Sequence, residues 1–288
     1  QYSTREAELL RLSGRHAIVR DVLEYRNAVK LKSVYVDQLP TAVNELTGRV
    51  HTHYNQAWTA TGRMQSNDPN LQTIPVRKAR GREIRAAFVP RNEEYSILAA
   101  DYSQIELRIL AHLSEDPALT QAFLDDMDIH QAVAAQVFGV APEDVSADQR
   151  NTAKIVNFGI IYGITPYGLS RRIEGLDRSE AAALIDDYRK RFPGINQFME
   201  TCVAEALING HVTTILGRRR KIDQIRGGRS SVQSLGERLA INTVVQGSAT
   251  GDLIKLAMVN LYRRIRRDRL PLKPVSYTHL TLPTSDLV

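Results

Sequence analysis

The alternation of hydrophobic and polar positions predicts a mainly helical chain with a few strands between the helices. Apolar residues recur at helical spacing in the segments 7–10, 19–31, 104–113, much of 116–191, 195–208 and 234–267. Short apolar or alternating runs predict strands at 50–54, 84–89 and 95–100, the last largely apolar and therefore buried, and a hairpin over 212–222. This order predicts an α+β fold, in which strands form a central layer and a long helical insertion separates the strand regions.

The composition is that of a globular protein with an excess of positive charge. Of 288 residues, 43% are hydrophobic and 24% are charged, which excludes wholesale disorder, and the net charge of +6 fits a polyanionic partner. The single Cys202 excludes an internal disulfide and a cysteine-cluster metal site, and it favours a reducing compartment, the cytoplasm. No apolar stretch approaches the ~18 residues of a membrane span, and no signal peptide opens the chain. We therefore expect no membrane partner. Because the first residue is Gln1 and not Met, we expect a piece of a longer protein.

A carboxylate at the end of the predicted strand 95–100 is the first chemical signal. Asp101 would face solvent there on a rigid backbone, and Mg²⁺ prefers such oxygen ligands and keeps several waters. Glu106 lies in the first turns of the following helix, within reach of the same cleft. The alternative is that Asp101 only ends the strand beside a helix N-terminus, where the helix dipole stabilises a negative charge. Taken alone, these residues favour that alternative.

A stripe of basic and aromatic residues on one predicted helix is a stronger signal. Residues 146–149 (SADQ) form a capping-box pattern that starts the helix, and Arg150, Lys154, Phe158 and Tyr162 follow at intervals of four along one face. Two cations beside the positive end of the helix dipole attract an anion, and the aromatic residues beyond them suit a flat ring. The stripe therefore predicts a nucleoside triphosphate site. An ordinary amphipathic helix would place the basic and aromatic residues on opposite faces.

Motifs spread over the chain resemble one known family. Residues 101–108 (DYSQIELR) resemble motif A of the family A DNA polymerases, and Arg150-x3-Lys154-x3-Phe158-x3-Tyr162-Gly163 resembles their motif B. Further likenesses to the bacterial DNA polymerase I type lie at 61–63, 68–75 and 128–130, and in Arg238-x3-Asn242-x3-Gln246-Gly247. The resemblance covers roughly residues 1–274 in the family's order, and several spaced motifs are far more specific than one.

The resemblance implies a right-hand polymerase fold, mostly helical with a small antiparallel palm sheet. Residues 1–46 would be part of the thumb, 47–115 and 240–274 the palm, and 116–239 the fingers, with the motif B helix at 147–163. The implied function is template-directed DNA synthesis in replication and repair. Deoxynucleoside triphosphates are added to a primer 3′ end by phosphoryl transfer with two Mg²⁺ ions. The implied partners are primer–template DNA and deoxynucleoside triphosphates, and the family's expectation is a monomer.

The resemblance also assigns roles to single residues. Asp101 would bind both Mg²⁺ ions, with Tyr102 lending its backbone carbonyl, and Glu106 would be the steric gate that excludes a ribose 2′-OH. The nucleotide-binding set would be Tyr102, Ser103, Gln104, Glu106, His130, Arg150, Lys154, Phe158 and Tyr162, of which Arg150 and Lys154 join Asp101 in catalysis. The DNA-binding set would be Arg63, Asn70, Gln72, Arg238, Asn242 and Gln246. Because minor-groove acceptors look alike for all correct base pairs, Arg63 and Gln246 would check pair geometry without reading sequence.

The C-terminal segment departs from the family pattern. Motif C of the family places His-Asp-Glu on a palm hairpin, whereas His279 has no acidic neighbour and the next acidic residue is Asp286. Residues 275–288 have no Lys, Arg or helical period, although an arginine-rich run at 263–269 precedes them closely. We expect these residues to be foreign or frame-shifted sequence rather than a disordered native terminus. The second metal-binding carboxylate would then be missing. We also expect the exonuclease domains, which would precede Gln1, and most of the thumb to be missing.

Two other functions stay open from the sequence. A single-subunit RNA polymerase shares the layout of motifs A and B, but Glu106 argues against it because such an enzyme must admit the 2′-OH. A catalytically impaired fragment that binds DNA and nucleotides would follow from the missing motif C. Primer extension with deoxynucleotides against ribonucleotides separates the first alternative, and a single-turnover incorporation assay decides the second.

Overall fold

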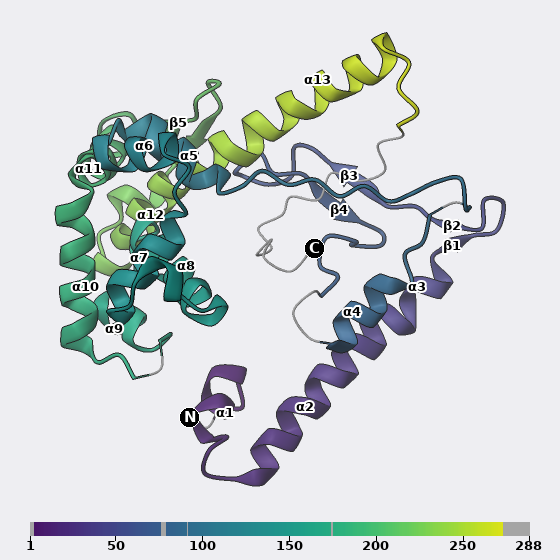
Figure 1. The fold of residues 1–288 in the computed structure, drawn as a ribbon, viewed down its shortest axis with the longest axis horizontal. Coiled ribbons are helices and arrows are strands. Elements are labelled where there is room, and N and C mark those ends of the chain that lie inside the picture. Colours follow the sequence, from purple (N-terminus) through teal and green to yellow (C-terminus); the bar gives the residue numbers. More distant parts are fainter. Residues whose placement is uncertain (1–2, 76–78, 91, 174, 273–288) are drawn as a thin grey trace. The chain divides into compact units, whose positions relative to one another are not determined.

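The computed structural model describes residues 3–75, 79–90, 92–173 and 175–272. The described chain forms two compact units: the first contains its residues up to Trp58 and Met64–Asp101, and the second contains Thr59–Arg63 and the described residues from Tyr102 to Leu272. Helices make up most of the described chain, and its strands form small antiparallel sheets (Figure 1). The predicted α+β class, mostly helical with little sheet, is confirmed. The predicted central strand layer is wrong, because the described strands form three separate two-stranded sheets.

The first unit is built from a long helix, shorter helices and two hairpins. Its helical elements are α1 (Glu6–Leu12), α2 (Ala17–Leu31), the π-helical turn η1 (Lys32–Val36), α3 (Gln38–Thr41) and α4 (Ala79–Ala86). Strand β1 (Val43–Asn44) pairs with β2 (Arg49–Val50), and β3 (His53–Asn55) pairs with β4 (Gln65–Asn67). The side chain of Asn44 holds the first turn, because its Oδ1 accepts bonds of 3.0 Å from the amides of Leu46 and Thr47. The hydroxyl of Tyr35 donates to the carbonyl of Thr73 and so ties the loop after β4 to η1.

Two predicted strands of this unit are not strands. Residues 84–86 belong to α4, whose Ala, Arg and Glu residues favour a helix over a strand, and 87–89 follow it without strand pairing. Residues 95–100 pair with no described strand, and Ile97 and Leu98 are 63% and 78% exposed. A strand is stable only when a neighbour meets its backbone hydrogen bonds, and apolar sequence alone supplies none. Asp101 is therefore exposed at the end of an unpaired segment and not at the mouth of a buried strand.

The second unit is a helical assembly. Before its hairpin lie α5 (Ile105–Ser114), α6 (Pro117–Leu124), α7 (Ile129–Phe138), the 3₁₀ turn η2 (Pro142–Asp144), α8 (Ala147–Ile161), α9 (Pro166–Ser170), α10 (Arg178–Arg191) and α11 (Pro193–Asn209). The hairpin of β5 (His211–Thr213) and β6 (Arg219–Lys221) confirms the one predicted over 212–222. The 3₁₀ turn η3 (Asp223–Arg226), α12 (Ser230–Gln246), the π-helical segment η4 (Gly247–Leu253) and α13 (Ile254–Arg267) follow. The helix predicted over 234–267 thus has a π-helical interruption.

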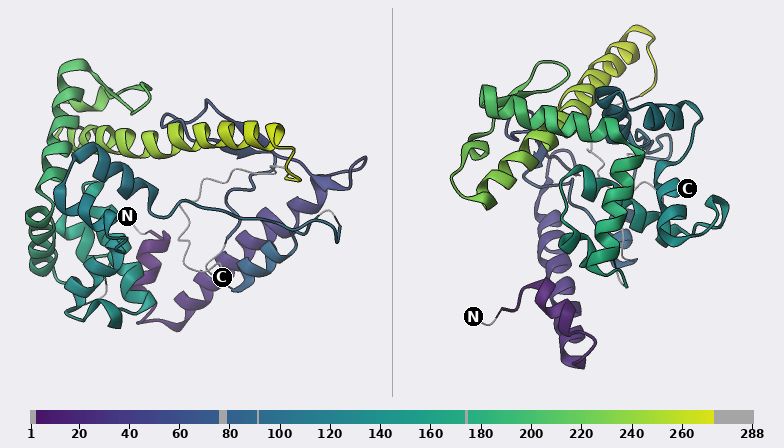
Figure 2. Two further views of the ribbon diagram at one scale, coloured as in Figure 1. Left: turned by 45° about the horizontal axis from the view of Figure 1, so that its top comes forward. Right: turned by 90° about the vertical axis from the view of Figure 1, so that its left-hand side faces the viewer.

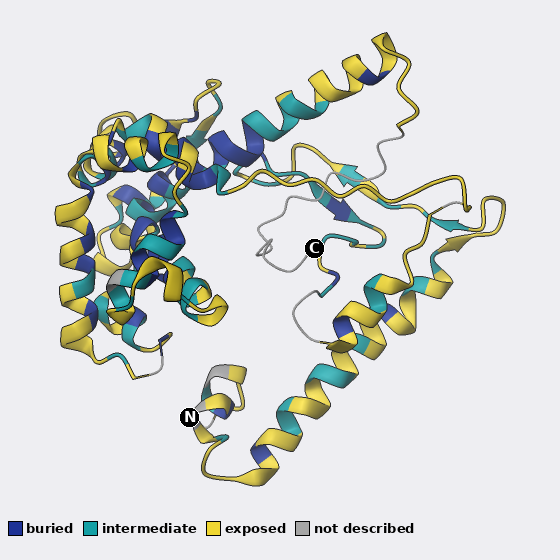
Figure 3. Cartoon of the chain, viewed as in Figure 1, coloured by how far each residue is buried: buried dark blue, intermediate teal, exposed yellow. Residues whose placement is uncertain are grey.

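Two buried clusters hold the second unit together (Figure 3). Leu107, Leu119 and Val156 belong to the larger cluster, and α7 packs against α8 within it (Figure 2). Cys202 belongs to the smaller cluster, between α11 and α12. Burial, with the nearby charge of Glu205, raises the pKa of this free thiol to about 12, so the cysteine acts as a packing residue.

Candidate functional site

The N-terminal end of α8 presents the predicted cation pair. Ser146 and Gln149 form the capping box that the sequence predicts, with reciprocal bonds of 3.2 and 2.9 Å. One turn on, Arg150 donates from Nε to Oδ2 of Asp128 at 2.7 Å, while Oδ1 of Asp128 caps α7 by accepting from the amide of His130 at 2.9 Å. Asp128 therefore fixes both the start of α7 and the guanidinium of Arg150. Partial burial alone would raise the pKa of Asp128, but the hydrogen bond and charge of Arg150 outweigh it and lower the pKa.

His130 is buried, with only 2% of its surface exposed, and its Nδ1 lies 2.8 Å from Nδ2 of Asn157 on α8. Burial lowers its pKa to about 4; the charge of Asp128 opposes this shift, and the charges of Lys154 and Arg150 add to it. The imidazole is therefore neutral near pH 7. With the Asn157 amide donating to Nδ1, the remaining ring proton lies on Nε2 and is available to an acceptor.

The aromatic part of the stripe continues from this histidine. The rings of His130 and Phe158 lie 5.7 Å apart in a tilted arrangement, and the rings of Phe158 and Tyr162 lie 6.0 Å apart and are stacked at 20°. Lys154, half-buried on α8, acts on His130 through its charge. The structure thus brings the predicted cations and rings together along one side of α8, as the spacing of four residues predicts.

The carboxylate of Glu106 joins α5, α8 and the loop before β4. The hydroxyl of Tyr162 donates to its Oε2, and Nη2 of Arg63 lies 3.1 Å from its Oε1. Arg63 also donates from Nε to Oγ1 of Thr250 at 3.1 Å, and Gln246 hydrogen bonds to Tyr162. Burial, with the charge and hydrogen bond of Glu106, raises the pKa of Tyr162, which stays a neutral donor. Glu106 is 7% exposed, and this burial is stabilised because both oxygens have partners.

Helix α12 carries a second line of predicted residues. Arg238, Asn242 and Gln246 follow at intervals of four and are half-buried, so they share one face of α12. Gly163, with φ +72°, lies against the side chain of Arg238, and a β-carbon there would be 3.0 Å from its Cγ. The turn after Tyr162 therefore packs directly on Arg238, and only glycine fits it without strain.

The remaining predicted residues lie elsewhere. Tyr102 and Ser103 are exposed, and Gln104 precedes α5 with a left-handed φ of +51°. In the first unit, Oδ1 of Asn70 accepts from the amide of Gln72 at 3.0 Å, and Oε1 of Gln72 accepts from the amide of Ser66 at 2.9 Å. Both amide side chains therefore stabilise their own loop, and a DNA-binding role for them stays a prediction.

Sequence reasoning missed two residues of this site, Asp128 as the partner of Arg150 and Asn157 as the partner of His130. Asp128 lies within the motif at 128–130, and an aspartate just before a helix indicates an N-cap. Asn157 is a fully buried polar residue between the apolar Val156 and Ile160, a pattern that indicates an internal partner.

The described residues do not form a complete metal site: among them, no three or more His, Cys, Asp or Glu side chains gather where they could hold an ion. Asp101 closes the first unit and Tyr102 opens the second. The motif C prediction falls on residues 275–288, which lie outside the described part.

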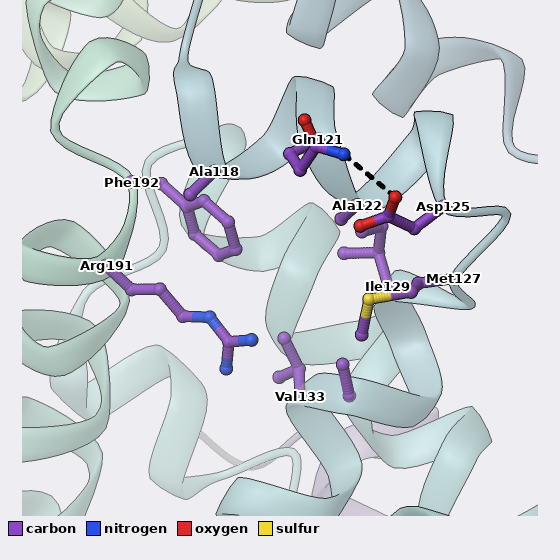
Figure 4. Close-up of a pocket in the computed structure, with 10 residues that line it drawn as sticks. Ala118, Gln121, Ala122, Asp125, Met127, Ile129, Val133, Arg191 and Phe192 are labelled. Carbon is purple, nitrogen blue, oxygen red and sulfur yellow. Dashed lines mark hydrogen bonds between the residues drawn. The ribbon is translucent and has the colours of Figure 1, made fainter.

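A separate cavity of about 230 Å³ lies between α6, α7 and the junction of α10 with α11 (Figure 4). Ile129 and Val133 of α7 line it with Phe192, and Gln121 donates to Asp125 at its edge over 2.8 Å. None of the predicted site residues lines this cavity. The candidate site is thus an arrangement of side chains along α8 and is separate from this cavity.

The sequence model of DNA polymerase family A matches residues 1–282, and the chain belongs to this family. Among the described residues, no helix is long and apolar enough to cross a membrane. Polymerases of this family generally use divalent metal ions.

Relatives and solved structures support the same assignment. The chain is 48% identical to DNA polymerase I of Geobacillus stearothermophilus over 96% of its length and 32% of that protein. It is 47% identical to DNA polymerase I of Pseudomonas aeruginosa over 97% of its length and 30% of the relative. It thus spans about a third of the length of these relatives. A solved structure, the POL domain of Pol1 from M. smegmatis in complex with DNA primer-template and dNTP, has a TM-score of 0.89 and 38% identity; the match covers 96% of the chain and 49% of that structure.

Proposed function

We propose that the chain is part of a DNA-directed DNA polymerase, a nucleotidyltransferase that adds deoxynucleoside triphosphates to a primer 3′ end on a DNA template. The observation that carries the proposal is the convergence of α5, α8 and the Arg63 loop on the carboxylate of Glu106, beside the cationic and aromatic stripe of α8. The relatives named DNA polymerase I support this function. The neighbouring structure, which holds DNA primer-template and dNTP, supports these two partners.

The cationic end of the stripe suits the triphosphate. Arg150 and Lys154 stand in the first turns of a capped helix, where unpaired amides and the helix dipole also favour negative charge. The neutral His130 would donate from Nε2 to a phosphate oxygen without adding charge. Phosphoryl transfer depends mainly on positioning and charge neutralisation, which these groups can supply.

The aromatic end of the stripe suits the base and sugar of the nucleotide. Phe158 would pack on the incoming nucleotide, and Tyr162 would lie at the templating position. Glu106 is buried and held from two sides, so its carboxylate would not move away from a ribose 2′-OH. This rigidity supports the steric-gate role and disfavours a single-subunit RNA polymerase, which must admit that hydroxyl.

The DNA would lie against the residues that carry polar side chains on α12 and in the loops. Arg63, Arg238, Asn242 and Gln246 would contact the minor groove of the primer–template terminus, and Asn70 and Gln72 would add contacts from the first unit.

Residues 1–46 would be part of the thumb, 47–115 and 240–274 the palm, and 116–239 the fingers. We further propose Mg²⁺ as the metal, with Asp101 and the carbonyl of Tyr102 as ligands, and a monomer in the cytoplasm.

The proposal is tested by template-dependent nucleotide binding. A labelled primer–template with a dideoxy-terminated primer is titrated with the chain in Mg²⁺, and the affinity is measured by fluorescence anisotropy. The templated deoxynucleoside triphosphate should tighten DNA binding about tenfold or more, since binding of the correct nucleotide and DNA is coupled. A non-templated deoxynucleotide and the matching ribonucleotide should not. Equal effects of all three nucleotides would contradict a templated DNA polymerase.

A further inference from the structure

Consecutive residues of the π-helical segment η4 hold the loop that carries Arg63. Oγ1 of Thr250 accepts from Nε of Arg63 at 3.1 Å. The next residue, Gly251, packs so tightly on the carbonyl oxygen of Thr61 that no β-carbon would fit there. The π-helical segment, a form found often at functional sites, therefore contacts the Arg63 loop on both sides of Gly62.

The third consecutive residue, Asp252, holds the β5–β6 turn. It is 8% exposed, and its Oδ2 accepts from the hydroxyl of Thr214 and, at 3.1 Å, from the amide of Leu216. Its Oδ1 lies 3.7 Å from Nε of Arg218. This nitrogen is buried and has no hydrogen-bond partner among the described residues. The Arg218 contact is therefore a charge interaction at a buried carboxylate.

Arg218 in turn leads back to the Arg63 loop. Gly62, with φ +78°, leaves its side-chain space to Arg218, and a β-carbon there would be 2.5 Å from Nε of Arg218. Gly62 immediately precedes Arg63, so a shift of Arg218 changes the room available to the loop. The two hydrogen bonds that Asp252 accepts from the turn need only a neutral acceptor, whereas its interactions with Arg218 and Lys255 depend on its negative charge.

We propose that Asp252 is a positioning residue for Arg63. Through Arg218 it fixes Gly62, and thereby the guanidinium that would check the geometry of the primer–template terminus. The inference rests on the proposed function of Arg63 in the minor groove. Asp252 would thus sharpen the distinction between matched and mismatched primer termini without touching DNA itself.

The test uses Asp252→Asn and Arg218→Gln. In Asp252→Asn the amide oxygen can keep the bonds to Thr214 and Leu216, but the amide group then faces Arg218 and the attraction is lost. Because Lys255 also interacts electrostatically with Asp252, Arg218→Gln isolates the Arg218 contact. Asp268→Asn is the matched control, since it removes an exposed carboxylate from Arg264 and Arg267 at the far end of α13.

The readout is the ratio of dissociation constants for mismatched and matched primer termini, measured with the whole chain by fluorescence anisotropy. Each of the two test variants should lower this ratio by about 3- to 10-fold, and the double variant should lower it no further, as for residues that act through one contact. Asp268→Asn should keep the wild-type ratio. Circular dichroism checks that each variant is folded.

The outcomes separate the two proposals. If the wild type does not bind primer–template, the proposed function fails. If the wild type distinguishes the termini and both folded variants do so equally well, the positioning role of Asp252 is overturned. Additive losses in the double variant would also overturn it, since Arg218 would then not carry the effect. If Asp252→Asn does not fold, Arg218→Gln alone decides, because the Arg218 side chain is 36% exposed and its loss leaves the turn bonds in place.

Discussion

Replacing Glu106 by alanine should relax sugar selection and weaken the fold. The side chain fills the space beside Tyr162 and Arg63, and its removal opens room for a ribose 2′-hydroxyl. Forcing extra atoms into a packed site typically costs about 1–3 kcal/mol. At ~1.4 kcal/mol for each factor of ten, the preference for deoxynucleotides should fall by about 5- to 140-fold.

The same substitution leaves Arg63 without its carboxylate. Breaking a buried ion pair costs about 3–5 kcal/mol, but Arg63 is 24% exposed and keeps Thr250, so we expect a loss of about 1–3 kcal/mol in the free energy of unfolding. The assay compares the affinities of the protein–DNA complex for a deoxynucleotide and the matching ribonucleotide, and urea unfolding gives the stability. Glu106→Gln is the control, because it keeps the size of the side chain and loses the charge and one of the two acceptor oxygens.

The two variants should separate in the sugar assay. Glu106→Gln should keep the wild-type preference within about threefold, since bulk and not charge excludes the hydroxyl. An unchanged preference in Glu106→Ala would refute the steric gate. Equal losses in both variants would show that the charge network with Arg63 and Tyr162 sets selection instead of the size of the side chain.

Three further predictions concern Lys154, His130 and Phe158. Lys154→Ala should weaken triphosphate binding about tenfold or more, as expected for a charge-assisted contact, and leave DNA affinity nearly unchanged. The control is Lys190→Ala, which removes an exposed lysine paired with Asp186. Equal losses in nucleotide and DNA binding would count against the assignment of Lys154 to the triphosphate. His130 has a folded pKa of about 4 against 6.5 unfolded. The unfolded chain therefore takes up the proton first, and stability falls from pH 6.5 towards pH 4 by up to about 3 kcal/mol. In His130→Gln, urea unfolding at pH 7 and pH 5 should lack this share of the pH dependence, and an undiminished dependence would exclude His130 as its source. The family resemblance implies that a tyrosine hydroxyl at position 158 offers a polar contact near the missing 3′-OH, so Phe158→Tyr should improve binding of dideoxynucleotides. Unaltered binding would remove Phe158 from a position facing the sugar.

The features that depend on neighbouring residues were predictable from the sequence. The start of α8 follows from its capping box, and the alignment of Arg150, Lys154, Phe158 and Tyr162 follows from the helical repeat. The β5–β6 hairpin follows from its turn around Gly217, whose φ is +87°. In each case the residues that determine the feature lie close together in the sequence.

The features that depend on distant partners were not predictable. Residues 95–100 have an apolar sequence, but without a described partner strand they stay exposed. The pattern of residues 234–267 predicts one continuous helix, but the π-helical segment η4 interrupts it. The contacts of η4 with the Arg63 loop join residues that lie far apart in the chain. Local pattern carries no information about such partners, because tertiary contacts decide them.

Three of the polar groups assigned to the nucleotide have a protein partner in place. Arg150 is held by Asp128, His130 by Asn157, and Glu106 by Tyr162 and Arg63. Buried charges without partners are costly, so these counter-groups keep the site folded and aligned without a ligand. A triphosphate that binds Arg150 must then share or replace Asp128, and the net gain is the difference between the two contacts. If the proposed nucleotide binds here, the site gives up part of its affinity for the nucleotide and gains rigidity, which discrimination between similar sugars and base pairs requires.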